Sequence, residues 1–153
     1  MGSEMCIRDR PFGEGEEDFN TDAFRTSVMP AFNGHATARA LAALYTNLAG
    51  VAMPDAPPLL SENGRAIMTT ERWHAVDALG LNNRMARGVR LSNGYSPFNG
   101  NPRSFGHGGI GGAVAFADPD AQIGFGFVTN RLVPGPGVSP YAQRLIDALR
   151  VSL

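Results

Sequence analysis

The sequence has 153 residues, of which 43% are hydrophobic, so it is long enough for one globular domain with a modest core. Its formal net charge of -1 provides no basic face, and we expect neither nucleic acid nor a membrane as a partner. The single cysteine, Cys6, excludes an internal disulfide and, with no signal-like segment present, favours a cytoplasmic location.

The first part of the chain carries little periodic pattern. Residues 1–10 differ in composition from the rest, and MCIRDR resembles a translated sequencing adaptor, so we treat this segment as a non-native tail. On that interpretation the coding region was cut upstream, and the natural protein is longer. Residues 11–32 contain an acidic run and are expected to form an irregular, solvated segment. Residues 33–153 are expected to form the domain itself.

Two helices are predicted at the start of that domain. Apolar residues recur at helical spacing over Ala38–Ala49, with Thr37 as the N-cap and Gly50 as the stop signal. Ser61 is expected to cap a second, short helix that carries Glu62 in its first turn, where a negative charge opposes the helix dipole favourably. We interpret this pair of helices as scaffold.

The following segments predict an antiparallel sheet of three to four strands. An irregular stretch containing Trp73 and His74 comes first, and a candidate strand over Met85–Leu91 follows it. After two Asn-Gly turns, the next strand is predicted over Arg103–His107. A β-hairpin is then predicted over Val114–Phe127, because apolar residues alternate with alanine or glycine on both sides of an Asp-Pro-Asp-Ala turn.

A C-terminal helix should lie across this sheet. Ser139 is its predicted N-cap and Pro140 occupies the first helical position. Gly124 and Gly126 share one face of the last strand, and we expect the helix to approach the sheet there. The apolar face of this helix is predicted to contain Tyr141, Leu145, Ile146 and Leu149. The predicted fold class is therefore α+β.

Five glycines surround His107 and Ile110 in the stretch 104–112, and glycine allows a backbone to approach a ligand closely. The letters satisfy the G-x-G-x-x-G dinucleotide fingerprint, but that motif opens a helix, whereas a strand is predicted here. A lipase-type H-G-G oxyanion loop requires a G-x-S-x-G turn, which the sequence lacks. Two interpretations stay open at this point: the edge of an active site, and a tight bend where a strand and a helix pack closely.

The segment FGHGGIGGAVAFADPD, followed by GFGFVTNR and a closing amphipathic helix, resembles the C-terminal end of the serine beta-lactamase, penicillin-binding protein and carboxylesterase superfamily, in its esterase-like branch. PAFNGHATARALAALYTNLAG and LLSENGRAIMTT resemble helices of the same branch, so the similarity covers residues 29–153. The resemblance implies a partial beta-lactamase/transpeptidase-like fold. It also implies acyl transfer through the serine of an S-x-x-K motif, assisted by the tyrosine of Y-x-N and by a third motif, K-T-G or H-x-G.

The resemblance places His107-Gly108-Gly109 at the third motif and makes the backbone N–H of Ile110 the second oxyanion donor. No lysine occurs in the chain, so S-x-x-K is absent, and we expect the Y-x-N motif to lie upstream as well. We therefore assign no catalytic residue here, and expect the missing N-terminal half of the same domain to supply them. Imidazole, with a reference pKa of about 6.5, is mostly neutral at pH 7. It offers no permanent cation for a substrate carboxylate, so the implied substrates are small-molecule esters, or amides, of the full-length protein.

The sequence predicts no cofactor and no metal site. His35, His74 and His107 match no compact ligand spacing, and no cysteine pair or H-E-x-x-H motif accompanies them. The alternative to a hydrolase portion without its nucleophile is a stand-alone structural or peptide-binding domain, whose glycine edge accepts a peptide strand. The DNA sequence upstream of the codon for Pro11 distinguishes the two hypotheses.

Overall fold

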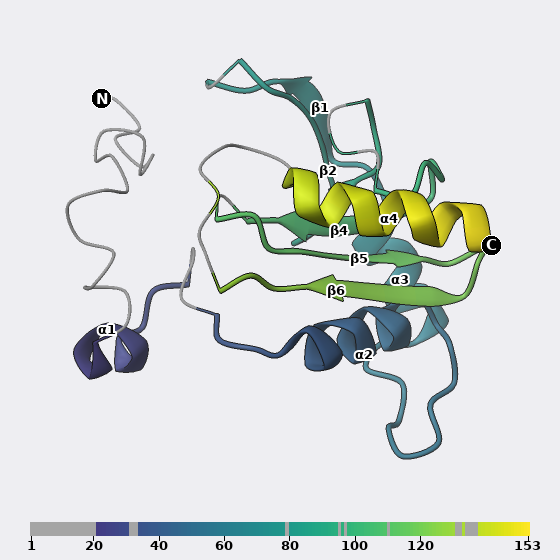
Figure 1. Cartoon of the computed structure of the whole chain (residues 1–153). Helices are drawn as coiled ribbons and strands as arrows, with labels where there is room; N and C mark the ends of the chain where they lie inside the picture. The colour runs from purple at the N-terminus through teal and green to yellow at the C-terminus, as the bar shows by residue number, and fades with distance from the viewer. Residues whose placement is uncertain are drawn as a thin grey trace. The chain divides into compact units, whose positions relative to one another are not determined.

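The computed structural model describes residues 21–30, 34–78, 80–94, 96, 98–109, 111–130, 133 and 138–153. The chain divides into two compact units, residues 1–35 and residues 36–153. The first unit contains helix α1 (Asp22–Thr26), which is capped by the Thr21 side chain. The second unit contains the other described helices and strands and carries the predicted site (Figure 1).

Helices α2 (Ala38–Leu48) and α3 (Glu62–Thr69) begin where the sequence predicts. The hydroxyls of Thr37 and Ser61 each accept a hydrogen bond of 3.1 Å from a backbone N–H in the first turn. These bonds satisfy amides that have no partner inside the helix. After α2, Gly50 takes a φ of 88°, the left-handed conformation that glycine favours at a helix end. In the described part of the chain, no helix is long and apolar enough to cross a membrane.

One antiparallel sheet organises the second unit, and it has more strands than the three to four predicted. Its six described strands follow each other in space in chain order. They are β1 (Trp73–Val76), β2 (Asn82–Met85), β3 (Arg90–Leu91), β4 (Phe105–Gly108), β5 (Val114–Asp118) and β6 (Ile123–Phe127). The predicted hairpin is confirmed as β5 and β6, and the α+β class is confirmed for the whole unit.

The additional strands lie at the β1 end of the sheet. Trp73 and His74, predicted to be irregular, belong to β1, and this prediction was wrong because all four β1 residues are exposed and show no apolar alternation. The single strand predicted over residues 85–91 is instead the end of β2, a turn and β3. Gly88 allows the chain to reverse there, with a φ of 76°.

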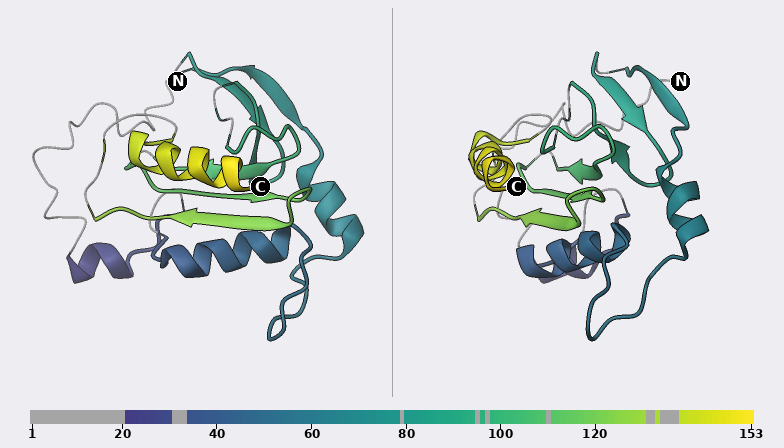
Figure 2. Two further views of the ribbon diagram at one scale, coloured as in Figure 1. Left: turned by 45° about the vertical axis from the view of Figure 1, so that its right-hand side comes forward. Right: turned by 90° about the vertical axis from the view of Figure 1, so that its right-hand side faces the viewer.

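Helix α4 (Pro140–Ser152) lies on one face of the sheet, with Ser139 as its N-cap, as predicted (Figure 2). Its buried face differs from the prediction, since Tyr141 and Leu145 are 60% and 51% exposed. The small side chain of Ala142 faces inward instead and brings the helix close to a row of aromatic rings. The core on this face is formed by Phe98, Val114, Phe116, Ala142 and Ile146, with Phe125, Phe127, Val138 and Leu149 packed against it.

The glycine face of β6 receives α2 and not α4, which corrects the predicted position of the C-terminal helix. A Cβ at Gly124 would lie 2.2 Å from the amide nitrogen of Thr46, and a Cβ at Gly126 would lie 2.4 Å from the carbonyl oxygen of Ala38. The alternation of glycine with larger apolar residues along β6 correctly predicted one face of small residues and one face of large residues. It could not predict which helix covers which face, because both helices are amphipathic.

Candidate functional site

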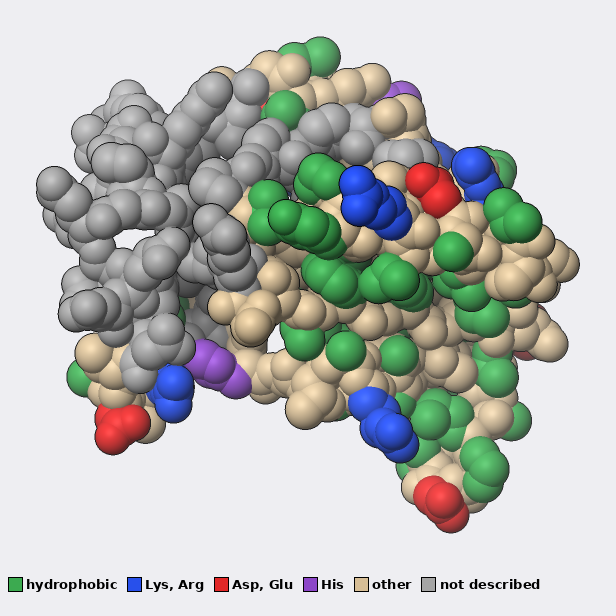
Figure 3. Space-filling view, viewed as in Figure 1, with side chains coloured by type: hydrophobic (Ala, Val, Ile, Leu, Met, Phe, Trp, Pro, Cys, Tyr) green, Lys and Arg blue, Asp and Glu red, His purple; other side chains and the backbone are tan. Residues whose placement is uncertain are grey.

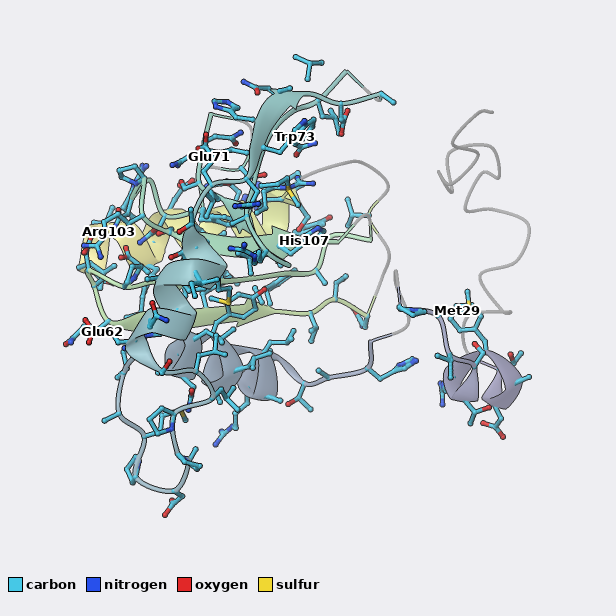
Figure 4. The ribbon with its side chains drawn as sticks, turned by 180° about the vertical axis from the view of Figure 1, so that it is seen from behind. Met29, Glu62, Glu71, Trp73, Arg103 and His107 are labelled. Atoms are coloured by element: carbon cyan, nitrogen blue, oxygen red, sulfur yellow. The ribbon has the colours of Figure 1, made fainter. Side chains whose placement is uncertain are left out.

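The candidate site lies at the end of β4, on the sheet face that α2 covers. His107 and Phe105 alternate with glycine along β4 and therefore point to the same face. Phe105 is buried, and its ring centroid is 6.4 Å from that of Tyr45 on α2. His107 is exposed, and its strand neighbour Ala115 pairs in turn with Gly126. Figure 4 labels His107 on β4 in the view from behind.

Glycine is required within β4 as well as after it. A Cβ at Gly106 would lie 2.2 Å from the carbonyl oxygen of Ala115 and 2.5 Å from the Cβ of Phe116. The backbone of β4 therefore approaches β5 at a distance that no other residue permits at this position. The chain after the glycine cluster continues as strand β5, which agrees with the rejection of a dinucleotide fingerprint.

A tight turn follows Gly108 and connects β4 to β5. The amide of Gly109 donates to the carbonyl of Ala113 at 2.7 Å, and the amide of Gly112 donates to the carbonyl of Gly109 at 2.9 Å. Gly112 has a φ of 96°, which favours glycine. Ile110, the predicted backbone oxyanion donor, lies outside the described residues. Because the Gly109 amide is already engaged in the turn, it is not available as a donor to a ligand.

The electrostatic environment of His107 favours the neutral imidazole. Partial burial lowers its pKa below the ordinary value of 6.5, and the positive charge of Arg90 lowers it further. A hydrogen bond with the backbone of Gly108 opposes these effects. Arg90 was not predicted as a site residue. It lies on β3, where it pairs with Gly106, and this neighbour relation follows only from the split of residues 85–91 into two strands.

The letters Y-x-N also occur within this chain, at Tyr45-Thr46-Asn47, which the expectation of an upstream motif did not take into account. The structure assigns these residues to scaffold contacts. The side-chain amide of Asn47 donates to the carbonyl of Pro57 at 2.9 Å, and its oxygen accepts from the amide of Leu59 at 2.8 Å. Burial raises the pKa of Tyr45, which opposes a role as a base.

The histidines are distributed over the two units of the chain, and the two in the second unit lie apart in the sheet. His35 belongs to the unit of residues 1–35, while His74 lies on β1 and His107 on β4, with two strands between them in the sheet. Among the described residues, no group of three His, Cys, Asp or Glu side chains is placed to hold a metal ion.

Comparison with known proteins relates this chain to beta-lactamases and esterases. The family described as Beta-lactamase matches residues 7–150. A curated relative, the esterase/beta-lactamase LipL of Mycobacterium tuberculosis (strain ATCC 25618 / H37Rv), is 32% identical over 105 residues. That match covers 69% of this chain and 24% of LipL.

Two solved structures share the fold over most of this chain. A family VIII carboxylesterase superposes with a TM-score of 0.83 at 32% identity, over 90% of this chain and 37% of its own. A penicillin-binding protein homologue from Caulobacter crescentus superposes with a TM-score of 0.77 at 33% identity, over 88% of this chain and 37% of its own. The chain therefore spans about a quarter of the curated relative and little more than a third of each structure.

Proposed function

We propose a function from one premise: this chain belongs to the beta-lactamase family, which it matches over residues 7–150. The protein of which it forms part is proposed to be a serine hydrolase that cleaves small-molecule esters, or amides, by acyl transfer. In this proposal residues 36–153 form one wall of the acyl-transfer pocket. The nucleophilic serine, its lysine and the catalytic tyrosine come from a part of the domain outside these 153 residues.

The observation that carries the proposal is the exposed imidazole of His107 at the end of a strand that continues into Gly108 and Gly109. A substrate can lie against a strand end whose next residues have no side chains, because the backbone is then within hydrogen-bonding distance. The imidazole is proposed to donate a hydrogen bond to the substrate or to shape the pocket. The backbone N–H of Ile110 is proposed as the second oxyanion donor.

The lowered pKa of His107 supports esters as the preferred substrates. A pKa below 6.5 leaves the imidazole mostly neutral at pH 7, so it offers no permanent cation for a carboxylate. A lysine at this position would offer a permanent cation, which suits an anionic substrate such as a beta-lactam. A neutral ester has no carboxylate, so histidine in place of lysine removes no ion pair with the substrate.

The first experiment sequences the genomic DNA immediately upstream of the codon for Pro11. We expect an in-frame extension that encodes S-x-x-K and a further Y-x-N motif. The extended protein should hydrolyse p-nitrophenyl acetate with saturation kinetics, and the 153-residue chain should not. Saturable turnover by the purified 153-residue chain, or an in-frame stop codon directly upstream, would contradict the proposal.

The second experiment tests the role of His107 in the extended protein. His107→Lys should raise kcat/KM for a chromogenic cephalosporin relative to p-nitrophenyl acetate by about tenfold, since a charge-assisted hydrogen bond contributes roughly 1.5–3 kcal/mol. His74→Lys, on the exposed strand β1, is the matched control and should leave the ratio unchanged. An equal effect of both substitutions would contradict a pocket position for His107.

A further inference from the structure

The turn between β4 and β5, residues 109–113, is held in place by a segment far from it in the sequence. The turn comes after His107, and its sequence includes Ile110, whose N–H is the proposed oxyanion donor. The amide of Val133, which follows β6, donates to the carbonyl of Gly111 at 2.9 Å. The turn is therefore bound to the chain beyond the β5–β6 hairpin, in addition to the hydrogen bonds that it forms within itself.

Ser139, the N-cap of α4, packs against the same turn. Gly112 is buried, and a Cβ at this position would lie 3.1 Å from the Cβ of Ser139 and 3.3 Å from the Cβ of Val133. Both distances are shorter than the roughly 3.5–4.0 Å that non-bonded carbon atoms prefer. Ser139 is itself only 5% exposed. Even a methyl group at residue 112 would therefore push the turn and the start of α4 apart.

Ser139 is fixed in turn because α4 is anchored at its cap and along its buried face. The Ser139 hydroxyl accepts from the amide of Ala142 at 3.2 Å, and its carbonyl accepts from the amide of Gln143 at 2.9 Å. Ala142 and Ile146 are fully buried in the core below the helix. Figure 3 shows hydrophobic side chains gathered over α4 and along β6 on the face in view, and Figure 1, from the same direction, shows α4 lying along the sheet. The position of the turn therefore depends on the packing of α4 on the core.

We propose that Gly112 and Ser139 are positioning residues for acyl transfer, because their contact fixes the turn that follows the His107-Gly108-Gly109 motif. The inference rests on the proposed function, since it concerns the turn to which the oxyanion donor is assigned. Both residues act through the turn and not by contact with the substrate. An oxyanion donor is effective only within about 2.7–3.1 Å of the developing charge, and a misplacement of about 1 Å can lower a rate about a hundredfold. A displaced turn should therefore slow the chemical step.

Backbone strain is the competing explanation for any effect of a substitution at Gly112. Its φ is 96°, a conformation that residues with a side chain rarely adopt. Gly80 provides a matched control, since its φ is 76° and no atom lies within 4 Å of a Cβ there. It belongs to the turn between β1 and β2, at the end of the sheet where β4 begins, away from the candidate site. The difference between alanine at residue 112 and alanine at residue 80 therefore measures the contact with Ser139 and Val133.

The test measures the hydrolysis of p-nitrophenyl acetate by variants of the extended protein. Gly112→Ala should lower kcat at least about tenfold and change KM by less than about twofold, because a displaced turn removes transition-state stabilisation and leaves the binding of the ester nearly intact. Gly80→Ala should leave kcat within about twofold of the wild-type value. Far-UV circular dichroism at the assay temperature establishes that each variant is folded.

A substitution at Ser139 tests the contact from the other side. Ser139→Gly removes the side chain that Gly112 contacts, and glycine is an acceptable N-cap. Alone, it should lower kcat by about threefold, because the turn loses support. Added to Gly112→Ala, it should raise kcat at least about threefold over that variant, because it removes the collision, whereas two unrelated losses of stability would add. Ser61→Gly, the same substitution at the N-cap of α3, is the control and should not change kcat.

Three results would overturn the positioning role in an extended protein whose wild type hydrolyses the ester. They are equal effects of Gly112→Ala and Gly80→Ala, a rise in KM with kcat unchanged, and no recovery of kcat in the double variant. If Gly112→Ala does not fold, Ser139→Gly decides, and an unchanged kcat then overturns the role. A wild-type extended protein that does not hydrolyse the ester would contradict the proposed function itself, and this inference with it.

Discussion

The contact between α2 and β6 predicts a large effect from a single methyl group at Gly124. A Cβ there would lie 2.2 Å from the amide nitrogen of Thr46 and 2.3 Å from the carbonyl oxygen of Ala42. Non-bonded heavy atoms prefer a separation of about 3.5–4.0 Å, so α2 would have to move by more than about 1 Å. Both atoms belong to the helix backbone and cannot move aside as a flexible side chain would.

We expect Gly124→Ala to lower the free energy of unfolding by about 3 kcal/mol, the upper end of the usual range for overpacking. For a chain of this length the melting temperature should fall by roughly 6–12 °C. Gly94→Ala is the control, since no atom lies within 4 Å of a Cβ at Gly94. It should leave the melting temperature unchanged or raise it slightly. Thermal melts followed by far-UV circular dichroism, supported by urea titrations, measure both variants. Equal melting temperatures for the two variants would refute the direct contact between the α2 backbone and Gly124 on β6.

Three further predictions concern charge and association. Asp118 is buried, and desolvation alone would raise its pKa. It accepts hydrogen bonds from the side chains of Asn99 and Asn101 and from the backbone amides of Ala121 and Asp120, and together these bonds lower the pKa below 3.8. Asp118→Asn should therefore lower the free energy of unfolding by about 3 kcal/mol at pH 7, as measured by urea titration. The difference from wild type should shrink as the pH falls below 3.8, because the unfolded wild-type chain gains the carboxyl proton before the folded chain does. The lowered pKa of His107 acts in the same direction: the free energy of unfolding should decrease as the pH falls below 6.5, because the unfolded chain gains the imidazole proton first, and His107→Asn should flatten that dependence. Finally, the apolar β6 edge should cause the isolated chain to associate at high concentration, and sedimentation that shows a monodisperse monomer at every concentration would contradict this.

Local signals in the sequence correctly predicted those parts of the fold that depend on neighbouring residues. Thr37, Ser61 and Ser139 each cap a helix as expected, because a cap requires only a hydroxyl three residues before an amide. The β5–β6 hairpin was predicted from alternation and a proline turn for the same reason. Strand β1 could not be predicted, since an exposed strand lacks the apolar alternation that distinguishes a strand from a loop.

Neighbouring residues in the sequence do not indicate which helix packs on which strand, or which strands pair. Two small residues on one face of β6 indicate that a helix approaches closely, but α2 and α4 both have an apolar stripe and a suitable length. The helix that fits is α2, because its side toward β6 brings Ala38 and Ala42 against the glycines. The position of Arg90 beside the candidate site was missed for a related reason, since it follows from the register of β3 on β4 and not from spacing along the chain.

The absence of lysine limits what these residues can contribute to an acyl-transfer pocket. All 13 cationic side chains are arginine, and a guanidinium with a pKa above about 12 cannot accept a proton from a serine hydroxyl. His107 is the titratable group at the candidate site, and both burial and the charge of Arg90 favour its neutral form. In the proposed pocket, these residues would therefore offer a close backbone and a mostly neutral imidazole at residue 107. Those properties would suit a neutral ester, which has no carboxylate that needs a cation.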